Sequence, residues 1–113
     1  MIYHLALRRD WEQAQRDGAY TQSTIGRTLA DEGFVHASSA AQWPVVRARF
    51  YGAVDEPLVL LHIDEARLRS PVVVEVGDPA TGELFPHVYG PIDLAAVVAT
   101  SRLEPPHGPG APV

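Results

Sequence analysis

The sequence predicts a small α+β domain with a mixed or antiparallel sheet and two main helices. Short runs of apolar, strand-forming residues are distributed along the chain, and two stretches near its first half have helical spacing instead. Strands and helices are interspersed without a regular repeat, which favours α+β over a doubly wound fold. The 113 residues fit one domain. We expect a globular part over residues 1–103 and a disordered Pro/Gly-rich tail over 104–113.

Residues 2–7 predict the first strand, because bulky apolar side chains alternate with other types. Ile2, His4 and Ala6 are expected on one face, and the intervening residues on the other.

Residues 8–17 then predict a helix whose inner side includes Trp11 and Ala14 and which ends at Gly18. A polar loop over 19–24 is expected next.

A short helical turn is predicted over 25–32, ending at Gly33, and a strand over 34–38 follows. The second main helix is expected from Ser39, where Gln42 is placed three residues on as a capping-box partner. This helix should run to residue 51 and end at the glycine that follows.

Residues 58–63 form a nearly continuous apolar run, which predicts a central strand. Asp64 is expected to cap a single turn. Another strand is predicted over 72–76, with Glu75 on the face opposite its alternate valines. Residues 77–82 are a loop by composition.

Two prolines, Pro86 and Pro91, flank a segment that we interpret as irregular, because proline cannot donate to a ladder in a central strand. Asp93 is expected to cap a brief turn, and residues 97–103 to close the sheet.

Composition excludes several chemistries. Cysteine is absent, so disulfides, thiolate metal sites and cysteine nucleophiles are excluded. All nine basic residues are arginine, which removes Schiff-base chemistry and the P-loop lysine. The net charge of −5 argues against general nucleic-acid or membrane-surface binding. Since the N-terminus carries neither a leader pattern nor a long apolar run, a cytoplasmic protein is expected.

Two strand histidines are the first candidates for a site. His4 and His36 each have a small residue two positions on, Ala6 and Ser38 respectively, on the same face of the strand. If the two strands are adjacent, the imidazoles share a cavity with room for a ligand. Protonation of the pair should then be coupled and shifted to or below the ordinary pKa of about 6.5. The alternative is two separate buried histidines, each bonded to backbone carbonyls.

The segment around the two prolines supplies further candidates. Phe85, His87 and Tyr89 lie where the backbone is restricted, which suits a rigid binding edge, although core packing would use similar residues. Glu75 either faces the cleft, where it could stabilise a developing cation, or is exposed by strand alternation. Arg49 could offer a guanidinium to a phosphate, or be a solvated helix arginine.

The remaining histidines are expected to be structural or irrelevant. His62 lies in the apolar central strand and is interpreted as a core or edge histidine, and His107 lies in the tail. We expect no metal site, because the sequence contains no HExxH motif or close His-x-His pair.

Four segments resemble a small bacterial family, domain of unknown function 952: Ile2–His4, Glu32–Ser38, Leu58–Leu61 and Gly82–Pro91. The resemblance covers residues 2–103, and the phenylalanine-proline-histidine-x-tyrosine-glycine-proline segment is its most specific part. That family is similar to the ADP-ribosyltransferase-like fold, in which a curved, split sheet holds NAD in a cleft. NAD-binding relatives commonly follow the first histidine with glycine and a hydroxyl residue, whereas Leu5 and Ala6 follow here.

The resemblance implies roles for individual residues. His4 would hold a ribose hydroxyl, and His36 would lie beside the scissile glycosidic bond or a phosphate. Glu75 and Tyr89 are both candidates for the third catalytic position. Phe85 and Tyr89 would wall the base pocket, with contacts from the residues Ser38, Arg49 and His87.

The leading hypothesis is therefore a transferase of the ADP-ribosyltransferase-like type that uses NAD, or a related nucleotide, as substrate. The chain would act as a monomer or weak dimer, without a metal. A second hypothesis is a non-catalytic module that binds a nucleotide-like ligand. A third is a purely structural interaction domain, in which His4, His36 and His87 would be scattered and individually satisfied.

Overall fold

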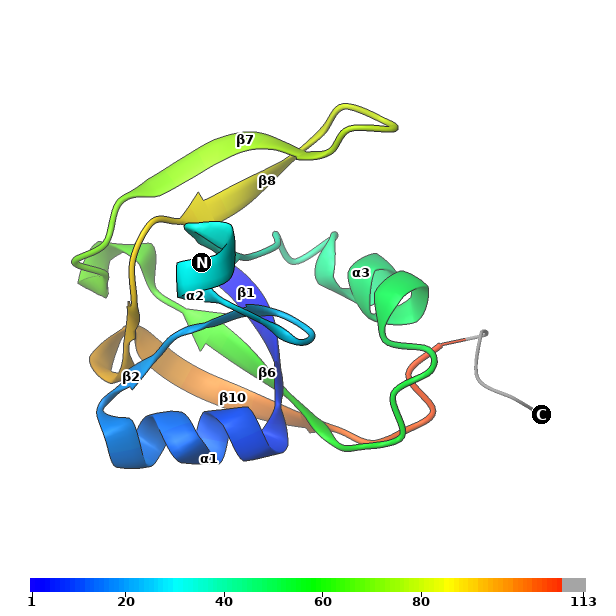
Figure 1. Cartoon of the computed structure of the whole chain (residues 1–113), viewed down its shortest axis with the longest axis horizontal. Coiled ribbons are helices and arrows are strands. Elements are labelled where there is room, and N and C mark those ends of the chain that lie inside the picture. Colours follow the sequence, from blue (N-terminus) through cyan, green and yellow to red (C-terminus); the bar gives the residue numbers. More distant parts are fainter. Residues whose placement is uncertain (109–113) are drawn as a thin grey trace.

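Two three-stranded antiparallel sheets organise the chain, which is therefore a small α+β domain with mostly antiparallel pairing, as predicted. The structure is a computed structural model and describes residues 1–108. Figure 1 shows the two sheets as separate layers, with the β7–β8 hairpin above and strands β6 and β10 below. The six strand pairings between named strands of the described residues are all antiparallel, so the mixed alternative was wrong.

The first sheet has the order β1-β6-β10. Its strands are β1 (Ile2–Leu7), β6 (Leu58–Ile63) and β10 (Val97–Leu103). The apolar run of β6 is central, with all its residues buried except His62, which is half-buried. The predicted positions of these three strands are confirmed. β6 is apolar at nearly every position because it is covered on both faces, whereas the edge strand β10 has no buried residue.

The second sheet has the order β5-β8-β7, formed by β5 (Val35–His36), β8 (Glu83–Val88) and β7 (Val72–Asp78). The prediction for Pro86 was wrong: it pairs with Val74 in the central strand of this sheet. The Pro86 carbonyl accepts a bond from the Ala37 N–H, at 3.0 Å. Its missing N–H therefore faces the place where β5 has already ended, so few ladder bonds are lost.

The two main helices also occur where they were predicted, as α1 (Arg8–Asp17) and α3 (Trp43–Phe50). Gly18 ends α1 in the left-handed region, with φ of 93°. Ser39 and Gln42 exchange the predicted reciprocal bonds, although regular helix begins only at Trp43. No helix within residues 1–108 combines the length and apolar character that crossing a membrane requires.

Short elements replace the predicted loop over 19–24. Tyr20 is almost completely buried, so this stretch packs into the core although its composition is polar. The predicted turn before Gly33 is helical only at its end. These elements are β2 (Ala19–Tyr20), β3 (Gln22–Thr24), β4 (Arg27–Thr28), α2 (Leu29–Glu32), β9 (Ile92–Asp93) and the 3-10 turns η1 (Glu65–Arg67) and η2 (Leu94–Ala96).

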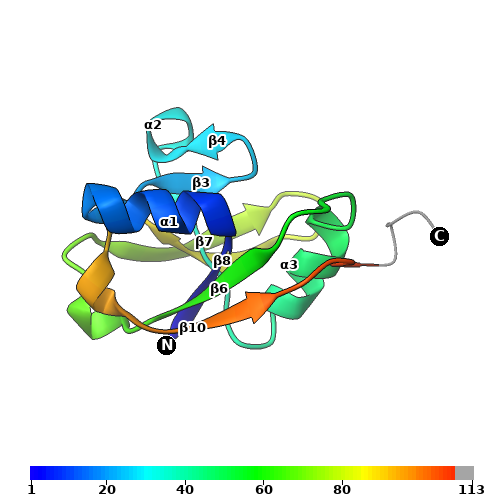
Figure 2. The same ribbon diagram turned by 90° about the horizontal axis from the view of Figure 1, so that it is seen from below.

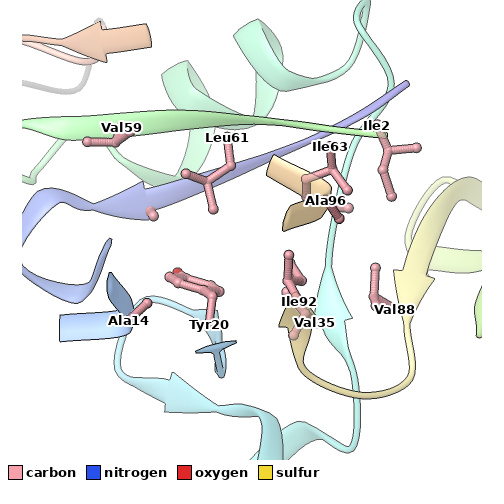
Figure 3. Packing of buried hydrophobic residues seen from close by; sticks show 12 residues of the cluster. Ile2, Ala14, Tyr20, Val35, Val59, Leu61, Ile63, Val88, Ile92 and Ala96 are labelled. Carbon is pink, nitrogen blue, oxygen red and sulfur yellow. The ribbon is translucent and has the colours of Figure 1, made fainter. Parts of the chain in front are cut away.

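The core consists of two clusters on the two faces of the first sheet. The larger cluster lies between the sheets, where Figure 3 shows Leu61 and Ile63 of β6 facing Tyr20 and Ile92. The smaller one lies under α3 and includes Leu5. Both views place α1 and α3 on opposite sides of β6 (Figures 1 and 2). The predicted alternation along β1 is confirmed, because its alternate residues supply different clusters.

The segment after β10 differs from the predicted disordered tail. His107 is 3% exposed, accepts a bond from Arg47 Nε at 3.1 Å and donates from Nε2 to the Glu56 carbonyl at 2.7 Å. These bonds fix residues 104–108 against α3 and the loop before β6, so His107 has a structural role. The predicted disorder of 109–113 lies outside the described residues.

Candidate functional site

A cleft of about 870 Å³ opens between the second sheet, α3 and the β3–β4 hairpin. Its inner wall carries three histidines that lie far apart in the sequence, and its rim is formed by α3 and by the turn after β7. The lining residues used below are Ser23, Glu32, Phe34, His4, His36, Ser38, Gln42, Val45, Arg49, Phe50, Gly77, Asp78, Glu83, Phe85 and His87.

A hydrogen-bonded chain runs from the back of the second sheet to the cleft. The Tyr89 hydroxyl donates to Glu75 Oε1, and His87 Nδ1 lies 2.8 Å from the same oxygen. His87 Nε2 lies 3.2 Å from His36 Nδ1. The strand register creates this arrangement, since His36 pairs directly with His87 across β5 and β8.

The acceptors in this chain determine the position of each proton when all the rings are neutral. An ionised Glu75 only accepts, so His87 Nδ1 must donate to it. His87 Nε2 is then an acceptor, and His36 Nδ1 donates to it. His36 Nε2 is left as an unprotonated nitrogen, with no bonding partner among residues 1–108.

His4 is positioned differently from His36. It is 3% exposed, and its Nδ1 lies 2.5 Å from the His36 carbonyl oxygen, which can only accept. Its Nε2 therefore accepts from the Tyr20 hydroxyl at 2.9 Å. Both ring nitrogens are used within the protein, so a ribose contact by His4 would require one of these bonds to break.

Burial keeps both histidines neutral at pH 7. Desolvation lowers the pKa of His4 to about 4, against the opposing effect of its bond to the His36 carbonyl. Desolvation, followed by the nearby His87, lowers the pKa of His36 to about 4. The predicted downward direction is confirmed, although burial rather than mutual repulsion is the main cause. Hydrogen bonds from Tyr89 and His87 lower the pKa of Glu75, which is therefore ionised.

Aromatic rings hold the histidines in place. Phe34 stacks on His87, with ring centroids 4.0 Å apart and planes inclined by 13°. Phe85 is buried and lies 4.8 Å from the His36 ring. Gly77 allows this packing, because a Cβ at that position would lie 2.6 Å from the Phe85 ring. The Phe85 ring therefore has little freedom to move.

The charged and hydroxyl groups of the rim complete the site. Arg49 NH1 bonds Asp78 Oδ2 at 3.0 Å, and its guanidinium lies over the Phe50 ring. Ser38 is 4% exposed, and its backbone pairs with Tyr3, which joins β1 to the cleft wall. The Ser38 hydroxyl has no partner among the described residues.

The structure brings most of the predicted site residues together. His4, His36, Ser38, Arg49, Phe85 and His87 line the cleft. Glu75 and Tyr89 lie behind His87 instead, and reach the cleft only through its ring.

Several residues at or next to the cleft were not predicted as site residues, among them Tyr20, Ser23 and Phe34. Phe34 precedes the β5 histidine, and this adjacency was a usable signal. Tyr20 and Ser23 fall in the stretch interpreted as a polar loop, where sequence offers no periodic pattern. Within residues 1–108, no group of three or more His, Asp or Glu side chains is arranged to hold a metal ion.

Comparison with known proteins identifies the family. The model of the family described as "Protein of unknown function (DUF952)" matches residues 5–100, so the chain belongs to that family. A crystal structure of protein CC0527 from Caulobacter crescentus has a TM-score of 0.76 and 26% identity, covering 91% of this chain and 85% of that one. The solution NMR structure of CC0527 gives a TM-score of 0.69 at 25% identity, covering 91% and 84%. No curated protein matches the chain.

Proposed function

We propose that the cleft binds a nucleoside-like or nucleotide-like small molecule and that His36 acts there as a general base in transfer at its glycosidic bond. The observation that carries this proposal is that His36 Nε2 has no bonding partner among residues 1–108, while His36 Nδ1 joins a hydrogen-bonded chain that reaches the Glu75 carboxylate. A buried imidazole with a free nitrogen and a supporting carboxylate is the arrangement that general bases use.

The chain of hydrogen bonds gives the proton a route. When His36 Nε2 takes a proton from an attacking hydroxyl or water, the His36 Nδ1 proton can pass to His87 Nε2. His36 then remains neutral, and the positive charge lies on His87, 2.8 Å from the Glu75 carboxylate. Glu75 and Tyr89 are positioning residues in this scheme, because neither lines the cleft.

The charge around the cleft suits the same reaction. Cleavage of a glycosidic bond develops positive charge on the sugar ring, and an acidic surrounding stabilises it. Glu83 lines the cleft without a cationic partner among the described residues and supplies that acidic surrounding, whereas Glu32 and Asp78 are paired with arginines. In this proposal His4 acts indirectly, because its hydrogen bond holds the His36 carbonyl in place. The Ser38 hydroxyl, rather than His4, contacts a sugar hydroxyl.

An NAD-consuming transferase of the ADP-ribosyltransferase-like type is the narrower form of the proposal. The cleft volume of about 870 Å³ falls in the range of small-molecule sites, which supports a ligand of that general size. The NAD pyrophosphate fits the lining poorly, because Arg49, the one arginine among the described residues that line the cleft, is already paired with Asp78.

The test combines binding with turnover. Nucleosides, nucleotides and NAD are added to the protein, and release of the free base is followed by chromatography. We expect His36→Gln to lower the rate at least about 100-fold, the contribution typical of a general base. The matched control is His62→Gln, because His62 bonds Ser101 in the first sheet and does not line the cleft. Equal rates for the His36 variant and the wild type would refute the proposal.

A non-catalytic binding module is the second candidate, and one observation favours it. With a pKa of about 4, His36 is a weak base at pH 7. In that case ligands bind without forming product, and His36→Gln weakens affinity without changing any rate.

A further inference from the structure

We infer that the cleft selects an uncharged, hydroxyl-bearing aromatic ligand of the nucleoside class and discriminates against its phosphorylated forms. The inference refines the ligand of the proposed function and rests on it for the location of the site. It does not depend on turnover. Three independent features of the cleft lead to it: its cations, its backbone N–H groups and its unpaired hydroxyls.

Among residues 1–108, the cleft has no positively charged side chain that is free to bind a phosphate. Arg49 is the arginine that lines it, and its NH1 is bonded to Asp78 at 3.0 Å. Glu32 is balanced by Arg27 at 3.0 Å, whereas Glu83 receives only the neutral Gln42 amide, at 3.0 Å. A phosphate that entered the cleft would meet an unbalanced carboxylate and a guanidinium that already has a partner.

The helix beside the cleft is closed to anions by its own side chains. Residues just before α3 line the cleft, where free backbone N–H groups would attract a phosphate. The Ser39 N–H donates to Gln42 Oε1 at 2.9 Å, and the Gln42 N–H donates to Ser39 Oγ at 3.3 Å. The capping box therefore occupies two of the donors that an anion would need.

The groups that remain open are neutral and suit sugar hydroxyls. His36 Nε2 accepts, and the Ser38 hydroxyl both donates and accepts; neither has a partner within residues 1–108. Ser23 Oγ is buried without a hydrogen-bond partner among the described residues, and Ser23 lines the same cleft. The Ser23 hydroxyl is fully buried, so the two groups open to a ligand are His36 Nε2 and the Ser38 hydroxyl.

The opposite wall suits a flat aromatic ring. Phe34 and Phe85 are fixed against the histidines, as described above. Across the cleft, Val45 and Phe50 of α3 are 63% and 59% exposed, an unusual exposure for large apolar side chains. A base that stacks between these walls would cover them, while its sugar faces His36 Nε2 and the Ser38 hydroxyl.

The experiment compares matched pairs of ligands. Uncharged nucleosides with different bases and their 5′-monophosphates are titrated into ¹⁵N-labelled protein at low ionic strength, where charge repulsion is least screened. We expect each bound nucleoside to have a Kd about tenfold lower than its monophosphate, equivalent to about 1.4 kcal/mol. Shifts should be centred on His36 and Ser38.

A charge variant separates repulsion from simple size exclusion. Glu83→Gln keeps an acceptor for Gln42 but removes the unbalanced charge, so it should improve monophosphate binding about threefold relative to nucleoside binding. The matched control is Glu104→Gln, because Glu104 pairs with Arg102 and does not line the cleft.

Each outcome bears on one claim. Tighter binding of the monophosphates would overturn the inference and leave the proposed function standing. Nucleoside binding without product would uphold the inference and refute the catalytic proposal. If neither ligand class binds, both claims are wrong.

Discussion

The two sheets of this protein differ in what their side chains do. In the first sheet, β6 buries five of its six residues and carries one half-buried histidine. In the second sheet, β7 has no fully buried residue, and Val74 and Val76 are more than half exposed. The first sheet thus supplies stability through burial. In the second sheet, the central strand β8 carries His87 and its hydrogen-bonded chain, and the edge strand β7 is partly exposed.

Truncating a single side chain should show the largest difference in stability contribution between the two sheets. Leu61→Ala removes a completely buried side chain at the centre of β6 and should lower the free energy of unfolding by about 3 kcal/mol. Val74→Ala on β7 should change it by less than about 0.5 kcal/mol, since Val74 is 63% exposed. Urea denaturation measures both. Equal losses would show that the second sheet is as tightly packed as the first.

Acid should reveal the two buried histidines. Their pKa values of about 4 lie below the unfolded value of 6.5, so the unfolded chain binds more protons between these limits. Stability is therefore complete above pH 6.5 and is lost as the pH falls towards 4. His4 alone should account for about 3 kcal/mol. Denaturation at several pH values tests this, and a constant free energy of unfolding between pH 7 and 4.5 would contradict it.

Removing contacts of the segment beyond β10 should lower the free energy of unfolding by a smaller but measurable amount. His107→Ala leaves Arg47 and the Glu56 carbonyl without their buried partner and should cost about 1–2 kcal/mol. A chain shortened after Leu103 should lose a similar amount, because it lacks the same bonds. An unchanged midpoint for both variants would restore the simpler prediction of an unattached tail.

The smallest predicted effect concerns which ring nitrogen of each histidine carries the proton. At pH 7, His4, His36 and His87 should all carry their proton on Nδ1, because a carbonyl, a ring nitrogen and a carboxylate accept there. Ring ¹⁵N chemical shifts distinguish this tautomer from the other. Glu75→Gln should disturb the tautomers of His36 and His87 but leave that of His4 unchanged. A proton on Nε2 of His36 would remove the base from the proposed function.

The local sequence pattern predicted those elements whose surroundings impose a single simple requirement on each residue. The strands over 2–7 and 58–63 are found in place because burial selects a simple apolar pattern, and the strand over 97–103 is also found in place although it has no buried residue. The helix over 8–17 and the capping box at Ser39 follow from side-chain rules that act within one turn. The histidines are not scattered as the third hypothesis required, because His4, His36 and His87 line one cleft.

The wrong predictions concern residues whose environment depends on a partner far away in the sequence. Pro86 belongs to a central strand because the neighbouring strand ends beside it, which no local rule reveals. His107 is buried because Arg47 and Glu56, more than fifty residues away, supply its bonds. Composition alone described that segment as a tail.

The amino-acid order by itself determined the fold class, the main strands and helices, and the chemistry that the chain lacks. The tertiary structure alone decided which histidine remains open. His4 and His36 have equivalent strand contexts in the sequence, yet Tyr20 closes the ring of His4, while the pairing of β5 with β8 leaves one nitrogen of His36 free. The physical reason is that hydrogen-bond saturation depends on which groups packing brings within about 3 Å, and the sequence does not record that distance.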